Sequence, residues 1–421
     1  MARTAPASPT PGSREPIPIR RPLTAVWQPW RRVTWVTAAT QVATQMGFGL
    51  GIPFMPLYVQ TLGITDRAEA ALWTGVLVGA AAVSMTVMSP IWGALSDRYG
   101  RKPMLIRSML GGAFLIGGMG FVTGVQQLLI LRLLQGALTG TVAAAGALVA
   151  SAAPAAELGF ALGLLNASIQ LGNSIGPAFG GILVGQVGFR WTFIAGGALL
   201  GVGTLLAVFW VEEPPRPARS PHAVDPGNLL VRTLRPFGWR RFRGVLVLQV
   251  VTQFAYSATW ALIPLYVQEM RLPPWLSIEL AAGLGVTVSA IVAAMTTSFL
   301  GRLVDRVGAE RVLAGALVAG GIAYALQSLV PDVWAFLALR LAVGLGVAGS
   351  TAALAVLTKT TAPSGREGAA YGAVSAAQAL GWGLGPLLGA GVVAVLGIPA
   401  LYLASGVVML VSGGSMWRRR L

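Results

Sequence analysis

Long apolar runs alternate with short charged or proline-containing breaks along the 421-residue chain. A helix needs about 20 apolar residues to cross the hydrocarbon core of a bilayer. By this measure the runs predict twelve spans, near 34–60, 72–95, 104–122, 126–150, 158–186, 190–211, 244–268, 278–300, 311–331, 333–357, 367–395 and 398–416. The fold class expected from the pattern is an all-α polytopic membrane protein with twelve transmembrane helices.

The composition agrees with a membrane protein and excludes an ordinary soluble domain. Charged residues make up only 10% of the chain, against about 25% in soluble domains. The chain has no cysteine, so disulfides, thiolate metal sites and cysteine nucleophiles are excluded. Its single histidine, His222, stands in a polar segment, which argues against a histidine metal cluster or catalytic triad. We therefore expect no metal and no cofactor.

The sequence gives little support to enzyme chemistry. A membrane-embedded enzyme would need acids or histidines clustered at a membrane face to bind metal or activate water, and the chain offers no such cluster. The G-x4-G-K-[ST] loop that binds nucleotide phosphates does not occur either, so ATP hydrolysis is not expected. The chain is predicted not to be an enzyme.

Basic residues are concentrated in alternate intervals between the apolar runs. The net charge of +16 could indicate nucleic-acid binding, but the bases do not gather on one face. They are dense before the first span, in 98–107, 216–243 and 302–311, and at 418–420, whereas the intervening loops hold few. By the positive-inside rule, both termini and the base-rich loops are cytoplasmic. We expect a multi-pass protein of the cytoplasmic (inner) membrane, with lipid rather than nucleic acid around it.

The most polar internal segment divides the chain into two parts. It is rich in proline and arginine, which predicts a cytoplasmic linker. The expected domains are a tail at 1–33, a six-helix bundle at 34–211, the linker at 212–243, a second six-helix bundle at 244–416 and a tail at 417–421. The first tail has no apolar core, so we expect no cleavable signal peptide, and the first span must direct insertion.

The two bundles repeat each other at an offset of 208 residues. The segment Pro56 to Gln60 recurs unchanged at Pro264 to Gln268, and Arg132 corresponds to Arg340. Two halves in the same orientation imply a pseudo-two-fold axis along the membrane normal. A site at the interface of such halves is the architecture of alternating-access transporters. The alternative is a duplication retained for folding alone.

A glycine-rich charged turn follows the second span and returns in the second half. The first copy contains Gly93, Asp97, Arg98, Gly100, Arg101 and Lys102; the second contains Gly301, Asp305, Arg306 and Gly308. Glycine lets helix ends approach and turn sharply, and an aspartate can accept hydrogen bonds from arginine or from backbone N–H groups. The positive-inside rule alone would explain Lys102 and Arg306, but not the two aspartates.

With this G-x-L-x-D-R-x-G-R-K turn the chain resembles the major facilitator superfamily, and specifically its twelve-helix drug:proton antiporters. The resemblance covers 34–416. It implies that Asp97, Arg98 and Arg101 form a charged latch, which holds the cytoplasmic side closed when the protein faces outward.

Two arginines lie within apolar spans, where a charge is costly and should face a partner or a wet cavity. Arg132 lies about 9–10 Å into the fourth span, and Arg340 is its equivalent in the tenth. The resemblance makes Arg132, Gln135 and Gly136 part of a motif associated with proton coupling. Snorkelling of the side chain to the outer headgroups is the alternative for Arg132.

The fifth span carries small residues at regular spacing, with Gly163, Gly172, Gly176, Pro177, Gly180 and Gly181. Small-residue packing would explain these glycines, and the proline bends the helix. Their full spacing is similar to the antiporter motif of drug-exporting facilitators, which importers generally lack.

The family fold implies that the first, fourth, seventh and tenth spans line the substrate cavity. The candidate lining residues are Gln41, Gln45, Phe48, Gln249, Gln253, Tyr256, Trp260 and Arg340. The glutamines of each pair are one helical turn apart and project from one face. An aromatic pocket with a few amides suits varied amphipathic ligands. Alternatively, each glutamine could join helices by hydrogen bonding.

One departure from many drug:proton antiporters concerns the acids. All fourteen fall in loops or at span ends, so the counter-charge expected for cationic drugs is missing and neutral or anionic amphiphiles are favoured. We expect a monomeric secondary transporter that exports small amphipathic molecules by alternating access, coupled to protons. The alternatives are a facilitator for one sugar, metabolite or siderophore, and a transport-inactive receptor or scaffold.

Overall fold

The computed structural model describes residues 29–213, 240–362 and 367–419, and every structural statement below refers to these residues. Most of the expected tail at 1–33 and of the linker at 212–243, including His222, lies outside them. The helices of the first half are α1 (Pro29–Gly51), η2 (Ile52–Phe54), α2 (Met55–Thr61), α3 (Arg67–Tyr99), α4 (Arg101–Met119), α5 (Val125–Leu138), α6 (Thr141–Ala152), η3 (Ala155–Glu157) and α7 (Leu158–Trp210). Those of the second half are α9 (Arg240–Trp260), α10 (Ile263–Val267), α11 (Ile278–Val307), α12 (Ala309–Gln327), α13 (Val333–Thr361), α14 (Glu367–Leu396) and α15 (Ile398–Arg419).

The helices have the length and composition of membrane spans. Nine helical stretches of the described residues are long and apolar enough to cross a bilayer. The longest, α7, has 53 residues but is non-helical at Gly188, where φ is 79°, so it comprises two helices. The remaining long helices are α4 and α9. The all-α membrane fold is confirmed, while the number of twelve crossings stays a prediction.

Three expected spans are interrupted, and proline or glycine stands at each interruption. The first span passes through the short helix η2, which contains Pro53, before α2 begins. The seventh is divided between α9 and α10, with Pro264 in the first turn of α10. The fourth, expected to be continuous over 126–150, breaks at Gly140, whose φ of 115° ends the helical path between α5 and α6. Proline lacks the N–H that a continuing helix would use, and glycine accepts positive φ.

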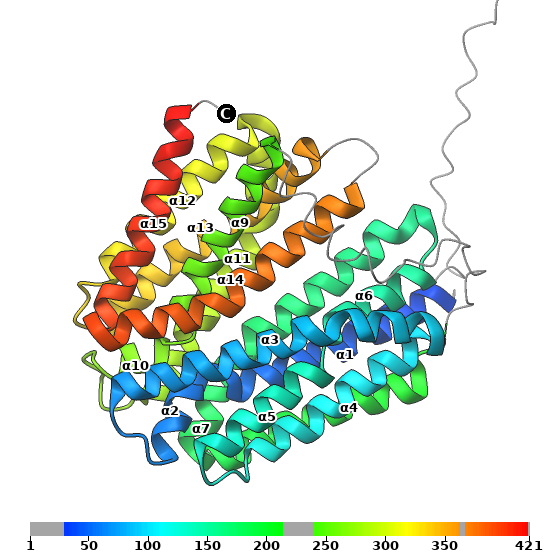
Figure 1. Cartoon of the computed structure of the whole chain (residues 1–421), viewed down its shortest axis with the longest axis horizontal. Coiled ribbons are helices and arrows are strands. Elements are labelled where there is room, and N and C mark those ends of the chain that lie inside the picture. Colours follow the sequence, from blue (N-terminus) through cyan, green and yellow to red (C-terminus); the bar gives the residue numbers. More distant parts are fainter. Residues whose placement is uncertain (1–28, 214–239, 363–366, 420–421) are drawn as a thin grey trace, which may run out of the picture.

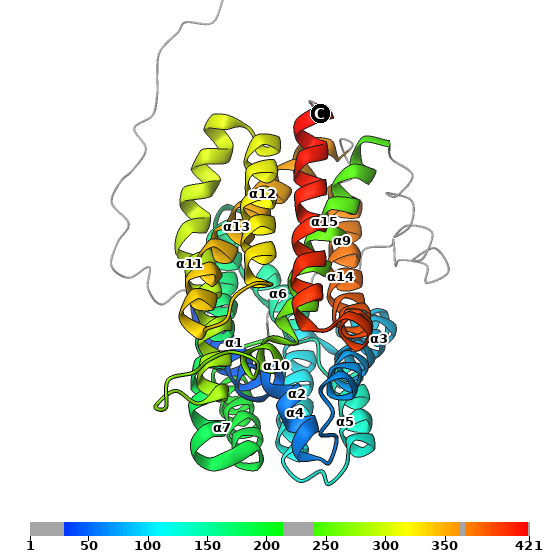
Figure 2. The same ribbon diagram turned by 90° about the vertical axis from the view of Figure 1, so that its left-hand side faces the viewer.

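The helices form two bundles, one from each half of the chain (Figures 1 and 2). In the first, α1 and α4 pack on α7, and α3 packs on α5; in the second, α9 packs on α14, and α12 packs on α13 and α15. Hydrogen bonds repeat with the 208-residue offset: Tyr58 donates to the Met119 carbonyl, and Tyr266 to the Gln327 carbonyl. The bundles are therefore related by pseudo-symmetry in detail, not only in sequence.

The two bundles touch each other near one end only. There, α7 packs on α11 and α3 on α14. Gly181 approaches the backbone of Glu279, and Gly75 approaches that of Pro386. We call this the far end, and we call the opposite end, with the turns at Gly100 and Gly308, the basic end. Figure 1 shows α3 and α14 close together near α2 and spreading apart in the other direction.

Candidate functional site

A stripe of exposed polar side chains runs along α7 between the basic end and the far end. Asn166, Gln170 and Asn173 recur at a spacing of four and three residues and are exposed. The same helical face continues to Pro177 and Gly181, which touch α11 of the other bundle. The stripe therefore faces the other bundle across the region where the two have separated, and not the lipid.

The second bundle carries an equivalent stripe on α14, made by Tyr371, Ser375, Gln378 and Trp382. Its face continues to Pro386, which contacts α3 of the first bundle. Polar side chains at membrane depth face a water-filled space when they are not paired in the protein interior. The two stripes thus line a polar path that opens at the basic end and is closed at the far end.

Sequence analysis did not include any of the stripe residues, such as Gln170 and Gln378, among the candidate lining residues. The sequence does contain a signal for a polar helix face, because Asn166 and Asn173 stand at helical spacing from Gln170 in an otherwise apolar span. Asn173 also accepts a hydrogen bond of 3.5 Å from Gln45 Nε2, which joins the stripe to α1.

The predicted cavity residues divide into two groups. Gln45 and Gln253 are half-buried and pack on α7 at Gly172 and on α14 at Gly381, at the edge of the stripes. Trp260 also borders the path, because its ring meets Trp382 of the α14 stripe edge-on at 5.3 Å.

The other predicted lining residues lie deeper. Gln41 is 0% exposed, with both side-chain amide atoms unpartnered, and Gln249 is 6% exposed. Phe48 is half-buried and packs in the first bundle toward Gly112 of α4. These three side chains do not line the path in this conformation. Tyr256 is half-buried, with its hydroxyl in the interior of the second bundle.

The expected antiporter motif of the fifth span mainly joins helices. Gly172, Gly176 and Gly180 pack against the α1 backbone; a Cβ on Gly176 would lie 2.9 Å from the Gly49 Cα. Gly181 instead meets α11, and Pro177 lies against Gly283 of that helix, so the motif also forms part of the contact between bundles. Gly163 has no neighbouring atom within 4 Å of an added Cβ, so close packing does not explain it here.

Arg132 is held inside the first bundle. Its NH1 donates to Gln135 Oε1 at 2.6 Å, and its Nε donates to the Leu77 carbonyl of α3 at 3.2 Å. The side chain is 4% exposed, so it does not snorkel to the membrane surface. Gly136 packs against the α3 backbone at Ala81, which brings the motif close to that helix. Arg340 occupies the equivalent place in the second bundle, with its Nε bonded to the Gly285 carbonyl.

The charged turn at the basic end is bound to its own bundle. The carboxylate of Glu213, which follows α7, accepts from the backbone N–H groups of Arg101 and Lys102 at 2.8 and 2.7 Å, and Lys102 Nζ donates to the Val208 carbonyl. Glu213 thereby caps the N-terminus of α4, a role that sequence analysis missed. Arg98 lies over the Tyr99 ring.

The predicted latch is not engaged across the bundles in the described part of the turn. The side chain of Asp97 lies outside the described residues, while Asp305 and Arg306 are exposed. Gly100 and Gly308, at φ values of 107° and 97°, make the two sharp turns. The expectation of close helix approach does not hold for Gly93 and Gly301, which have open space around them.

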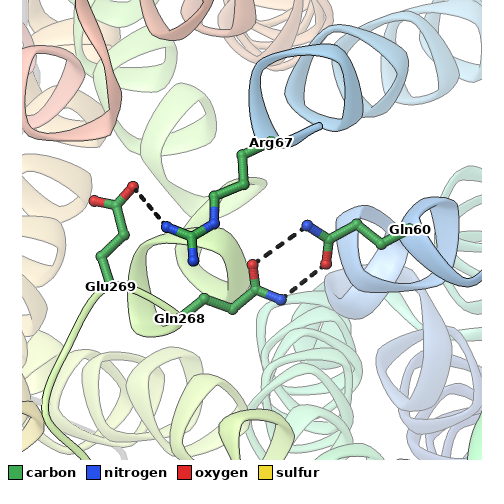
Figure 3. Close-up of polar contacts among 4 residues, drawn as sticks. All are labelled: Gln60, Arg67, Gln268 and Glu269. Atoms are coloured by element: carbon green, nitrogen blue, oxygen red, sulfur yellow. Dashed lines mark hydrogen bonds and ion pairs between the residues drawn. The ribbon is translucent and has the colours of Figure 1, made fainter. Parts of the chain in front are cut away.

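The far end is closed by polar contacts between the bundles that sequence analysis did not foresee (Figure 3). The side-chain amides of Gln60 and Gln268, which are repeat equivalents, exchange two hydrogen bonds of 3.3 and 2.8 Å. Next to them Arg67 forms an ion pair with Glu269 at 3.5 Å. Gln60, Arg67 and Gln268, together with Thr65 and Ile278, border a shallow cavity of about 390 Å³. Among the described residues there is no cluster of three metal-ligating side chains.

Two helical bundles around a polar path that opens at one end are the architecture of a membrane transporter. The chain belongs to the Major Facilitator Superfamily, whose sequence profile matches residues 37–285 and 272–420. It is a transporter and not an enzyme.

Named relatives and solved structures agree with this family. The chain is 31% identical, over 396 residues, to the multidrug resistance protein MdtG of Salmonella paratyphi C, covering 93% of this chain and 97% of that protein. Its fold matches a bacterial homologue of the human lysosomal transporter Spinster in an inward-facing, unoccupied conformation, with a TM-score of 0.74 at 15% identity, covering 93% and 97% of the two chains. It also matches the nucleoside transporter NupG, with a TM-score of 0.73 at 14% identity, covering 92% and 98%.

Proposed function

We propose that this transporter exports small amphipathic molecules across the cytoplasmic membrane by alternating access, in exchange for protons. The observation that carries the proposal is the pair of polar stripes on α7 and α14, which open at the basic end. Under the positive-inside rule the basic end is cytoplasmic, so this conformation takes up its substrate from inside the cell. The similarity to proteins named for multidrug resistance supports a drug-like substrate.

The walls of the path support a substrate of mixed character. Amide side chains from Asn173 and Gln378 alternate with the aromatic rings of Tyr371 and Trp382. Aromatic and apolar walls with a few hydrogen-bonding groups tolerate changes in ligand shape. We propose that release follows when the bundles rock, so that the far end opens and the basic end closes through the turn at Asp97, Arg98 and Arg101.

Proton coupling is proposed at the fourth span. Arg132 and Gln135 form the buried polar pair next to α3, which joins the two bundles at the far end. A change in this pair can therefore move α3 and, through it, alter the contact between the bundles. We further propose that the protein acts as a monomer with both termini in the cytoplasm.

The experiment uses inverted membrane vesicles energised to an acid interior and a panel of amphipathic compounds. The proposal expects compound-dependent proton release, which is lost in Asp97→Asn. Gln378→Leu removes an amide from the path and should lower transport about tenfold, because a polar contact to the substrate is lost. Leu384→Val, which alters an exposed apolar side chain on another face of α14, is the matched control.

The outcomes separate the parts of the proposal. Accumulation of labelled compound without proton release would retain export and reject proton antiport. Equal transport by Gln378→Leu and the control would remove the stripes from the substrate path. If neither assay gives a response although the protein is folded, drug export would be rejected in favour of a narrower substrate.

A further inference from the structure

Arg340 is a buried cation whose contacts are incomplete. The side chain is 4% exposed on α13, within the second bundle. Its Nε donates to the Gly285 carbonyl and its NH2 to Ser289 Oγ, both at 2.7 Å. Its NH1 is also buried but has no hydrogen-bond partner. A charged donor left unpaired in a low-dielectric interior carries a large desolvation cost, so a further acceptor is expected at this nitrogen.

Arg132, the repeat counterpart of Arg340, has a partner for its NH1, so the missing hydrogen bond is specific to the second bundle. Arg132 has the same Nε contact to α3, but Gln135 supplies an acceptor for its NH1. The residue equivalent to Gln135 in the second bundle is Val343, which accepts nothing. The pseudo-symmetry thus preserves the arginine but replaces the Gln135 acceptor with Ser289, whose counterpart in the first bundle is Ala81, and it leaves Arg340 NH1 without a partner.

Hydroxyl groups converge on the same region of the second bundle. The Tyr324 ring lies 6.0 Å from that of Tyr256 and 6.1 Å from that of Tyr402, and the Tyr324 hydroxyl lies within hydrogen-bonding reach of Arg340. The hydroxyls of Tyr256, Ser350 and Tyr402 are buried; that of Tyr402 has no partner, and those of Tyr256 and Ser350 lie beside each other without a hydrogen bond of full geometry. Each hydroxyl can donate one hydrogen. Arg340 NH1 and these hydroxyls, from three helices, therefore include donors that the described protein leaves unpaired, although each hydroxyl can also accept.

The charge of the site is also uncompensated within the described chain. Arg340 forms no ion pair with a described Asp or Glu; its partners are the Gly285 carbonyl and the hydroxyls of Ser289 and Tyr324. One guanidinium charge surrounded by hydroxyl donors matches a ligand with one negative charge, because such a ligand satisfies the donors and offsets the charge together. A neutral water would satisfy the donors but would leave the charge.

We propose that Arg340, with the hydroxyls of Tyr256, Ser350 and Tyr402, binds a single monovalent anionic group inside the second bundle. That group is either a free inorganic anion or the anionic end of a transported molecule. Anion binding can be measured on the purified protein, and only the second source rests on the proposed export.

The site lies one layer of side chains behind the polar path. Tyr256 shares one face of α9 with Gln249, Gln253 and Trp260, and Trp260 touches the α14 stripe through Trp382. Tyr256 is half-buried, with its ring toward this edge and its hydroxyl inside. An anionic group would therefore enter from the path past the Tyr256 ring.

The test measures thermal unfolding of the purified full-length protein in sodium chloride and in sodium gluconate at equal ionic strength. Chloride should raise the melting temperature of the wild type by about 2 °C, saturably, because it binds the folded state. Arg340→Gln should lose this shift in melting temperature. Arg132→Gln is the control, because Arg132 has its own acceptor in the wild type. Its melting temperature in chloride should still exceed its melting temperature in gluconate by the same amount. If Arg340→Gln does not fold, Tyr402→Phe replaces it and should bind chloride about tenfold more weakly, because it loses one charged hydrogen bond.

A panel of monoanionic amphiphiles identifies the source of the anionic group. An amphiphile that raises the melting temperature only when Arg340 is present, and that competes with chloride, would show that both bind at the site. A stabilising amphiphile without any chloride effect would assign the site to the transported molecule. The proposal would be overturned if chloride shifted the melting temperature of Arg340→Gln or Tyr402→Phe as much as that of the wild type. It would also be overturned if no anion had an effect that depends on these residues. Both outcomes hold whether or not the protein exports drugs.

Discussion

Buried polar side chains in this protein are satisfied mainly by local acceptors. Arg132 obtains one acceptor from Gln135, three residues further along its own helix, and one from the Leu77 carbonyl of α3. This arrangement holds a charge inside a bundle without a carboxylate partner among the described residues. It also joins two helices, so its loss should affect both local stability and the position of α3.

The Arg132 contact can be tested by removing its acceptor. Gln135→Leu leaves NH1 buried without a partner, so it should reduce the free energy of unfolding by about 1–3 kcal/mol. Thermal unfolding of the purified protein measures this. Val343→Leu, at the equivalent buried position of the second bundle, changes no hydrogen bond and serves as the control. If the two variants are equally stable, the Arg132–Gln135 bond contributes nothing to stability.

At the scale of elements, the break between α5 and α6 is a clear departure from pseudo-symmetry. Its counterpart α13 is continuous from Val333 to Thr361. The carbonyls of Ala137 and Leu138, at the end of α5, accept from Trp92 Nε1 and Arg107 NH1, both at 2.6 Å. These two donors from α3 and α4 satisfy groups that would be costly to leave unpaired in a membrane.

The positive φ of Gly140 gives a direct test of the break. Gly140→Ala should lower the free energy of unfolding by about 1–2 kcal/mol, because an L residue is strained in that conformation. Gly146→Ala lies within α6, where an added methyl also meets no atom within 4 Å. That control should instead be neutral or stabilising by up to about 1 kcal/mol. A stabilised Gly140→Ala would show that the fourth span is a continuous helix.

At the scale of the whole molecule, the balance between conformations depends on the small area where the bundles meet. Gln60, Gln268, Arg67 and Glu269 supply its polar part (Figure 3). An apolar cluster behind them combines Phe54, Leu57 and Ala71 of the first bundle with residues of the second. Opening of the far end must separate both sets, whereas the separated basic end has no such contacts to break among the described residues.

Weakening the amide pair should shift the protein toward opening at the far end. Gln268→Ala removes two hydrogen bonds, and we expect about tenfold faster labelling of a cysteine introduced by Ala71→Cys, measured with an impermeant maleimide outside cells. The native chain has no cysteine, so the reporter has no background. Arg271→Ala is the control, because the Arg271 backbone pairs with Asp332 of its own bundle. An unchanged rate in Gln268→Ala would mean that the amide pair does not restrain opening.

Much of this architecture follows from local sequence, and the exceptions have physical causes. Apolar runs and the repeat predicted the helices, the two bundles and the parallel placement of Arg132 and Arg340. The break at Gly140 was missed because a glycine inside an apolar run also fits a packed helix. The contact of Glu213 with Arg101, 112 residues away, depends on tertiary structure. The functional roles of the predicted site residues stay predictions.

The paired amides at the far end differ from the neighbouring ion pair in their response to the surroundings. Arg67 and Glu269 have side chains that are 51% and 32% exposed, so dissolved ions screen their attraction. The amides of Gln60 and Gln268 carry no charge and do not titrate. If this end faces the exterior, the closure should persist when the salt concentration outside rises, because the amide pair keeps its hydrogen bonds where the ion pair weakens.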